Sequence, residues 1–272
     1  MGVGTEPPRT MDRTVPPELR RDQILSLVRE REFVRVTDLS DMFGISEVTV
    51  RSDLDLLHES GSLQRVHGGA VVRAPVSRTE RSLEESSSSA PEEKADIGTA
   101  AAAMVSNGET IILDVGSTTT AVARALVRRK DLHNVVVFTS AINVALELEP
   151  AIPRFTVVVT GGTLRPLQHS LVDPMANHIL ERLNVSTVFL GCNGVHPDEG
   201  ITNVNLPETA VKRHMLNAAQ RCVVVAESSK IGNISVVKIA DIDTVDVLVT
   251  GPAAPIEALA EIEARGPVIV VA

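Results

Sequence analysis

Residues 36–70, VTDLSDMFGISEVTVRSDLDLLHESGSLQRVHGGA, decide how the N-terminal part of this chain folds. A cap at Thr37 predicts a short helix over 38–43, and Gly44 permits the positive φ of the turn behind it. Ser46 is placed to cap a second and longer helix. Two short helices joined by a glycine turn predict a helix-turn-helix.

The second helix has one face for the core and one for solvent. Val50, Leu54 and Leu57 recur at helical spacing, so we expect them in the core. The opposite face and the first turn then point outward, where helices of this kind meet base edges and phosphates. The DNA contacts expected here are Ser46, Glu47, Thr49, Arg51 and Ser52.

Two short extended runs around a glycine pair follow the second helix and predict a β-hairpin wing. Arg65 and His67 on this wing are expected to reach the DNA backbone. The helix-turn-helix spans about residues 35–54, within a DNA-binding domain over residues 18–73. Residues 1–17 contain four prolines and few apolar side chains, so we expect a disordered lead-in.

This stretch resembles the DeoR-type winged helix-turn-helix almost from end to end. The resemblance rests on Val36, Leu39, Phe43-Gly44-Ile45-Ser46, Thr49-Val50-Arg51, Asp53-Leu54, Leu57, Gly61, Leu63, Arg65 and His67-Gly68-Gly69-Ala70. One position departs from it, because that family usually has a second Arg where this chain has Ser52.

Composition limits the partners. The net charge of −9 argues against coating nucleic acid non-specifically, and residues 1–73 hold ten Arg against twelve Asp and Glu. Trp and Tyr are absent, which removes the stacking platform of single-strand binders, so duplex DNA is the expected partner. No apolar run long enough to span a membrane and no signal peptide occur, so we expect a cytoplasmic protein without membrane contact. Two distant cysteines imply neither a metal site nor a disulfide framework.

A polar, Ser-rich segment over residues 74–91 predicts a flexible linker. Beyond it, short β-branched runs alternate with helical patterns over residues 92–272. The strands expected are 110–113, 135–138, 155–159, 188–190, 222–226, 245–249 and 268–271. This alternation predicts an α/β domain with a mostly parallel sheet covered by helices on both faces.

The segment Asp114-Val115-Gly116-Ser117-Thr118-Thr119-Thr120 follows a strand and opens a helix, and therefore predicts an anion cradle. It is neither a Walker A loop nor a dinucleotide-binding fingerprint, so no cofactor is expected. Ligands of parallel sheets gather at the carboxyl ends of strands, where further polar loops follow. The ligand contacts expected are Asp114, Gly116, Ser117, Thr118, Thr119, Thr120, Thr139, Ser140, Gly161, Gly162, Arg165, Asn193, Gly194, Lys212 and Lys230.

The larger domain resembles the DeoR sensor domain, which is similar in fold to ribose-5-phosphate isomerase. The matching elements are the 114–119 loop, Thr139-Ser140 with Asn143, Gly161-Gly162, Gly194, Lys212 and Ser228-Ser229-Lys230, within a segment from Glu93-Lys94 to Thr250. The chain departs from the family at Leu171-Val172-Asp173-Pro174, where a Gly usually precedes the Pro.

These patterns predict a homo-oligomeric transcription regulator, a repressor of carbohydrate metabolism genes controlled by a phosphorylated sugar. The alternative from another class is a sugar-phosphate isomerase-like enzyme with a fused helical domain, in which Asp114, Asp198, Glu208, Lys212 and Lys230 would transfer protons. A third reading makes the larger domain an oligomerisation scaffold only. The helix-turn-helix motif is more specific than any catalytic set here, so we expect no enzyme.

Overall fold

The computed structural model describes residues 16–31, 33–59, 62–66, 68–71 and 80–272. They form two compact units, divided between Pro75 and Val76. Most of the lead-in expected at residues 1–17 lies outside the described residues, and Pro17 begins the first helix.

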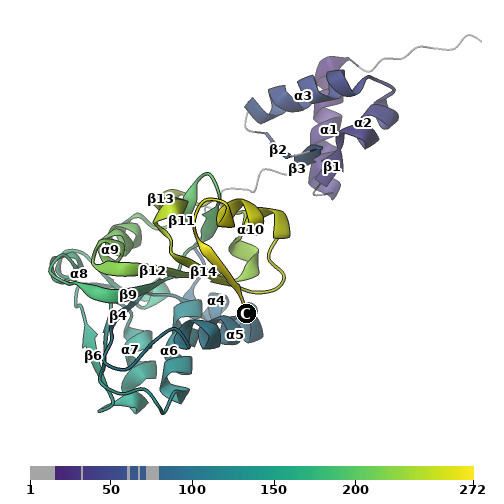
Figure 1. Cartoon of the computed structure of the whole chain (residues 1–272). Coiled ribbons are helices and arrows are strands. Elements are labelled where there is room, and N and C mark those ends of the chain that lie inside the picture. The colour runs from purple at the N-terminus through teal and green to yellow at the C-terminus, as the bar shows by residue number, and fades with distance from the viewer. Residues whose placement is uncertain (1–15, 32, 60–61, 67, 72–79) are drawn as a thin grey trace, which may run out of the picture. The chain divides into compact units, whose positions relative to one another are not determined.

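The N-terminal unit is a winged helix-turn-helix, which confirms the predicted fold. Its apolar core takes Ile24 and Val28 from the first helix and Val50, Leu54 and Leu57 from the third. The strands form an antiparallel sheet in the order β1-β3-β2 (Figure 1). The elements are α1 (Pro17–Arg31), β1 (Phe33–Arg35), α2 (Val36–Phe43), α3 (Glu47–Glu59), β2 (Gln64–Val66) and β3 (Gly69–Val71).

The start of α2 differs from the prediction that Thr37 caps it. Strand β1 runs directly into the helix, and the side chain of Arg35, at the capping position, makes no capping bond. The N–H of Val36 donates instead to the carbonyl of Gly68, 2.9 Å away. Pairing with the wing therefore sets the beginning of α2, which a pattern within the helix does not reveal.

The C-terminal unit is built on a seven-stranded sheet whose neighbouring strands all pair in parallel. The strand order is β15-β14-β12-β9-β4-β5-β6. This confirms the predicted α/β class and every strand expected from the sequence. The strands are β4 (Thr110–Leu113), β5 (Val135–Thr139), β6 (Phe155–Val159), β9 (Val185–Leu190), β12 (Ala219–Val225), β14 (Val247–Thr250) and β15 (Val268–Val271).

Helices cover both faces of this sheet (Figure 1). Because side chains alternate along a strand, Ile111 and Leu113 of β4 pack into one core while Ile112 packs into the other. The first core holds α5 (Pro91–Ala102), α6 (Ser117–Arg128) and α7 (Ile142–Leu148), and the second holds α8 (Met175–Leu180), α9 (Leu206–Asn217) and α10 (Ile256–Glu263).

Several short elements were not expected from the sequence. Strands β10 (Gly194–His196), β11 (Gly200–Asn203) and β13 (Val237–Ala240) form a small antiparallel sheet, and β7 (Thr163–Arg165) pairs with β8 (Ser170–Val172). Helices α5 and α8 were likewise not expected, nor were α4 (Leu83–Ser88) and the 3₁₀ helices η1 (Glu149–Ala151), η2 (Pro166–Gln168), η3 (Ser228–Lys230) and η4 (Ile242–Thr244).

The linker predicted at 74–91 is wrong from residue 80 onward, while residues 74–79 lie outside the described residues. The side chain of Ser82 accepts the N–H of Glu85 at 3.1 Å, and Glu85 accepts the N–H of Ser82 at 2.9 Å. This capping box starts α4, and the side chain of Leu83 is buried. Serine-rich composition suggested flexibility, but here serines cap and flank a docked helix, so the C-terminal unit begins before residue 92.

Candidate functional site

Helix α3 presents the face expected from the sequence. Arg51 and Ser52 are exposed, as is Val48, whose side chain is 72% exposed. The hydroxyl of Ser46 accepts the N–H of Thr49 at 3.2 Å, which confirms the predicted cap. Val48 was not among the predicted contacts, although its apolar side chain is exposed to solvent in the first turn of α3.

The two arginines predicted to touch DNA are each paired with an acid on α3. Arg51 lies 2.7 Å from Glu47, one helical turn away, and Arg65 of the wing forms an ion pair with Asp55. Both pairs are largely exposed, so they are weak and can exchange partners. His67, the third basic side chain predicted, lies outside the described residues.

A buried ion pair ties α1 to α3 beneath this surface. The guanidinium of Arg20 donates to Asp53 at 2.6 Å, and their side chains are only 8% and 5% exposed. Arg21 adds a longer contact of 3.6 Å to the same carboxylate. Asp53 therefore holds the recognition helix in place from inside, a role that the motif alone does not reveal.

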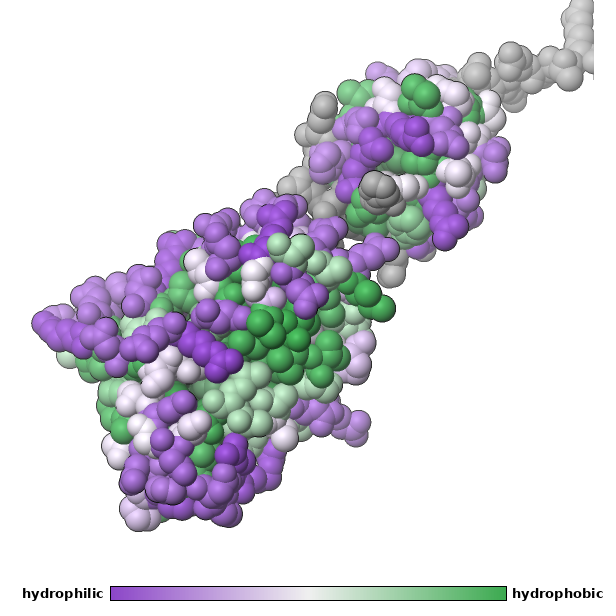
Figure 2. All heavy atoms as spheres, viewed as in Figure 1, coloured by the Kyte–Doolittle hydropathy of each residue, from purple (hydrophilic) through white to green (hydrophobic). Residues whose placement is uncertain are grey.

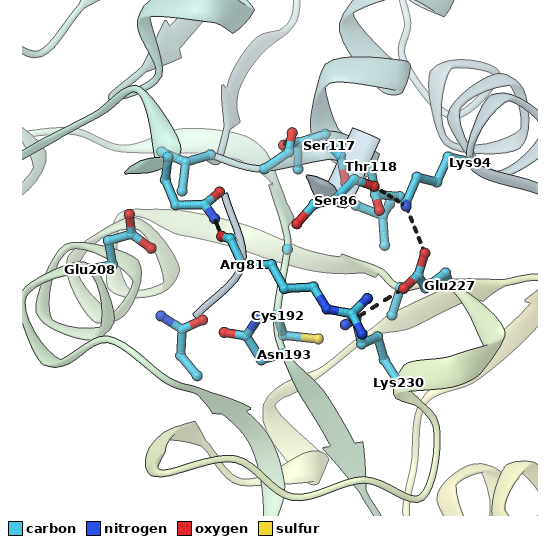
Figure 3. A pocket seen from close by; sticks show the side chains of 18 of the residues that line it. Arg81, Ser86, Lys94, Ser117, Thr118, Cys192, Asn193, Glu208, Glu227 and Lys230 are labelled. Carbon is cyan, nitrogen blue, oxygen red and sulfur yellow. Dashed lines mark hydrogen bonds and ion pairs between the residues drawn. The ribbon is translucent and has the colours of Figure 1, made fainter. Parts of the chain in front are cut away.

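In the C-terminal unit, a polar pocket opens at the carboxyl ends of β4, β9 and β12 (Figure 3). In the strand order, β5 and β6 follow β4 in one direction. Strands β9, β12, β14 and β15 follow it in the other direction. The pocket thus lies at the point where the strand order reverses, the usual ligand position in such sheets. It brings together these predicted contacts: Gly116, Ser117, Thr118, Thr119, Asn193, Lys212 and Lys230.

The first turn of α6 forms one wall of the pocket. Its backbone N–H groups have no acceptor within the helix, and the helix dipole favours negative charge there. The hydroxyls of Thr119 and Thr120 donate to the carbonyl of Gly116 at 2.9 and 2.7 Å, so these hydroxyls are already engaged. The hydroxyls of Ser117 and Thr118 have no partner among the described residues and line the pocket.

Lys212 reaches the pocket from α9 and is held by Asp114, with which it forms a buried ion pair. Its ammonium group also donates to the carbonyl of Gly191 at 3.0 Å, and the N–H of Gly191 donates to Asp114 at 2.9 Å. Burial raises the pKa of Asp114, while the neighbouring ammonium opposes that change. Asp114 lies behind the pocket wall and positions Lys212, in contrast to the direct contact expected.

The loops after β5 and β6 lie away from the pocket, which corrects the prediction for their residues. Strand β8 folds over them, and the N–H of Leu171 donates to the carbonyl of Ser140 at 2.7 Å. Gly162 approaches so closely that an added Cβ would lie 2.4 Å from the carbonyl of Val172. The residues concerned are Thr139, Ser140, Gly161 and Gly162.

Three further predicted contacts lie behind the lining. Thr120 accepts a bond from the side chain of Asn143 at 2.7 Å, within the helical layer. An added Cβ on Gly194 would lie 2.4 Å from the carbonyl of Asn233, so this glycine allows two loops to meet. Arg165 binds Glu208 and lies 2.8 Å from Glu80, two acids that do line the pocket.

Sequence reasoning missed much of the charged lining. Lys94 of α5 is 4% exposed and lies 2.7 Å from Glu227, which follows β12. Burial alone would raise the pKa of Glu227, but Lys94, Ser229 and Lys230 outweigh it and lower that pKa. The Glu93-Lys94 pair was a sequence signal for this wall. The other missed lining residues include Glu80, Arg81, Ser86, Ser89, Gln168, Cys192, Asn203 and Glu208.

Of the acids and bases proposed for an isomerase, Glu208, Lys212 and Lys230 line the pocket, whereas Asp114 lies behind it and Asp198 outside it. Asp198 is paired with Arg265 outside the pocket lining, and Glu208 accepts bonds from Arg165 and from Ser170, at 2.6 Å for the latter. Burial raises the pKa of the Cys192 thiol to about 12, which favours the protonated thiol at neutral pH. No group of three metal-ligating side chains occurs among the described residues.

A winged helix-turn-helix unit joined to an α/β unit with an anion-suited pocket defines a ligand-responsive DNA-binding regulator. The profile of the DeoR C terminal sensor domain matches residues 89–252, and that of the DeoR-like helix-turn-helix domain matches residues 20–76. The HTH-type transcriptional regulator GlpR of Haloferax volcanii is 33% identical to this chain, covering 93% of it and 97% of that protein. The glycerol-3-phosphate regulon repressor of Escherichia coli K12 is 27% identical, with 88% of this chain and 93% of that protein covered.

The chain therefore belongs to the DeoR family and is a transcription regulator, not an enzyme. Among solved structures, ribose 5-phosphate isomerase A of Methanocaldococcus jannaschii is similar at 19% identity and a TM-score of 0.38, over 52% of this chain and 55% of that chain. No helix within the described part of the chain has the length and apolar character needed to cross a membrane.

Proposed function

We propose that this protein is a repressor whose C-terminal unit binds a phosphorylated sugar. The observation that carries the proposal is the first turn of α6, where free N–H groups and the hydroxyls of Ser117 and Thr118 line the same pocket as Lys212 and Lys230. Backbone N–H groups, a helix N-terminus and ammonium groups together suit a phosphate dianion. The similar repressor of a glycerol-3-phosphate regulon supports this ligand class.

A screen of sugar phosphates against thermal unfolding tests the proposal. A ligand present at about a hundred times its Kd should stabilise the fold by about 2.7 kcal/mol. The Ser117→Ala, Thr118→Ala double variant should lose most of that stabilisation, because it lacks two hydroxyl donors, while Thr156→Ala at an exposed position of β6 should keep it. Unphosphorylated sugars should have little effect. A double variant that responds like the wild type would place the ligand elsewhere.

For the N-terminal unit, we propose that α3 and the wing read duplex DNA through Ser46, Glu47, Thr49, Arg51, Ser52, Arg65 and His67. The exposed face of α3 supports this role, and we add Val48, whose apolar side chain suits contact with a thymine methyl group. Because operator DNA is its target, we place the protein in the cytoplasm.

We also propose that the protein is a homo-oligomer. Helix-turn-helix proteins commonly read two half-sites as dimers, which needs a second copy. The C-terminal unit ends in an apolar edge strand, β15, with Val268 59% and Val271 54% exposed. Figure 2 shows apolar side chains gathered over this part of the surface. An exposed apolar edge of this kind is suited to pairing with a second copy.

A further inference from the structure

Residues 80–89, here called the strap, form one wall of the pocket and are docked on the loop between β7 and β8. Arg165 lies 2.8 Å from Glu80, and His169 lies 3.3 Å from Glu84. The amide of Gln168 donates to the backbone carbonyl of Arg81. The strap thus contacts one side of the pocket through three residues, Glu80, Arg81 and Glu84.

The strap is also tied to the opposite side. The ammonium group of Lys94 in α5 donates to the carbonyl of Ser86 at 2.7 Å and to that of Ser89. The same ammonium lies 2.7 Å from Glu227 on the pocket wall. Lys94 therefore connects the strap directly to the charged lining, because one ammonium group contacts both the strap carbonyls and Glu227.

Arg81 is the cationic side chain of the strap among those that line this pocket (Figure 3). The other pocket cations already have acidic partners. Lys212 is paired with Asp114, and Lys94 and Lys230 share Glu227, at 2.7 and 3.6 Å. Among the described residues, the Arg81 guanidinium has no acidic partner. Figure 3 shows it directed across the pocket toward Lys230 and Glu227.

A guanidinium without an acidic partner in a polar pocket is a binding group for an anion. Its planar donors match the oxygens of a phosphate in pairs, which an ammonium group does not achieve. Lys230 approaches the same region, and one carboxylate, Glu227, is shared between two ammonium groups. The Arg81 end of the pocket therefore has spare positive charge for an anionic ligand.

We propose that Arg81 is an effector-binding residue and that the strap couples occupancy of the pocket to the DNA-binding unit. This inference rests on the proposed function of the pocket. In sequence, only residues 72–79 separate the strap from β3 of the wing. An anion held by Arg81 adds a contact that exists only while the strap is docked, so binding favours the docked strap. By linkage, phosphate and DNA must then alter each other's affinity by the same factor.

The test uses the full chain and inorganic phosphate as the probe. We expect Arg81→Ala to raise the phosphate Kd about tenfold, the effect of losing one charge-assisted contact. Arg81→Lys, which keeps the charge but not the fork, should fall between. Arg182→Ala, at an exposed position after α8, should match the wild type. Because Arg81 is exposed, the unfolding temperature without phosphate should be the same in all variants.

Hydrogen exchange and DNA binding complete the test. Phosphate should slow exchange in residues 80–89 of the wild type but not of Arg81→Ala, and it should change the affinity for selected operator DNA in the wild type and Arg182→Ala but not in Arg81→Ala. If Arg81→Ala binds phosphate as tightly as the wild type while the Ser117→Ala, Thr118→Ala variant does not, this inference is overturned and the proposed pocket stands. If the wild type binds neither phosphate nor any sugar phosphate, both are overturned.

Discussion

Asp53 and Arg20 form the most deeply buried charge pair among the described residues of the N-terminal unit. Two charges removed from water are costly unless they satisfy each other, and removing one leaves the other buried without compensation. The Asp53 carboxylate, which Arg21 also approaches, thus adds a polar contact between α1 and α3 to their apolar packing.

We predict that Asp53→Ala destabilises the N-terminal unit by about 3–5 kcal/mol, the usual cost of breaking a buried pair from one side. Hydrogen exchange of the α1 and α3 amides in the full chain measures this local stability. Asp55→Ala on the same helix is the matched control, because its pair with Arg65 is exposed and should contribute less than about 1 kcal/mol. Equal exchange rates in the two variants would contradict the prediction.

His196 makes the C-terminal unit sensitive to acid. Its ring Nδ1 accepts the N–H of Asp198 at 3.1 Å, a bond that requires this nitrogen to carry no proton. Burial lowers the pKa of His196 below its ordinary value, against the opposing charges of Asp198 and Glu199. The folded state therefore resists protonation more than the unfolded chain does.

Because the folded pKa is depressed, the neutral ring's contribution to stability is present above the unfolded pKa, about 6.5, and is lost as the pH falls through the folded pKa. We predict that the unfolding temperature falls between about pH 7 and pH 5 and that His196→Asn makes this fall shallower. The exposed His178→Asn is the control and should leave the slope unchanged. A slope that is identical in wild type and His196→Asn would remove His196 as its source.

At the level of elements, the positive charge of Arg51 on α3 is paired with the negative charge of Glu47 on the same helix. Glu47 and Arg51 are one turn apart and paired, with side chains 44% and 52% exposed. If Arg51 contacts DNA as proposed, phosphates compete with Glu47 for its guanidinium, and breaking the Glu47–Arg51 pair offsets part of the attraction to DNA. This balance suits specific binding in a chain whose net charge is −9, since general attraction to DNA is weak.

We predict that Arg51→Ala weakens operator binding by about 1–3 kcal/mol if the guanidinium contacts a base. Glu47→Gln should release Arg51 and raise affinity for random DNA, with a steeper dependence on salt. Fluorescence anisotropy over a series of salt concentrations measures both effects, with Arg182→Ala as the control. Unchanged binding of Arg51→Ala to operator and random DNA would exclude Arg51 as a contact.

At the scale of the whole molecule, the seven-stranded sheet has two edge strands, β15 and β6. Strand β15 at one end is a run of four apolar residues, VIVV, with its outermost side chains exposed. Such edges are usually protected by charge or covered by another chain. The exposure at β15 therefore supports the proposed pairing of two copies.

We predict that Val268→Lys with Val271→Lys shifts the protein from oligomer to monomer, because two charges on the edge cannot be buried between copies. Sedimentation or light scattering of the full chain measures the mass. Thr156→Lys, at an exposed position of the opposite edge strand β6, is the control and should leave the mass unchanged. An unaltered mass in the β15 variant would place the interface elsewhere.

Local patterns were sufficient for the main elements. The spacing of Val50, Leu54 and Leu57 identified the buried face of α3, and the Gly-Ser-Thr-Thr loop identified the start of α6. These signals are local because helix caps, glycine turns and apolar periodicity act over a few neighbouring residues. They also predicted an anion cradle at the end of a strand.

What the sequence alone determined was therefore the two units, the kinds of their elements and the loop at the start of α6, because these follow from short-range chemistry. Only the tertiary structure decided which loops share the pocket, since that depends on strand order. It put β9 beside β4 and β12 beside β9, and it covered the ends of β5 and β6 with β8, so Ser140 and Gly162 lie away from the pocket. It also folded a serine-rich segment into the strap, because the contacts of Glu80 with Arg165 and Asn205 join residues 85 and 125 positions apart. No local pattern encodes contacts over such distances.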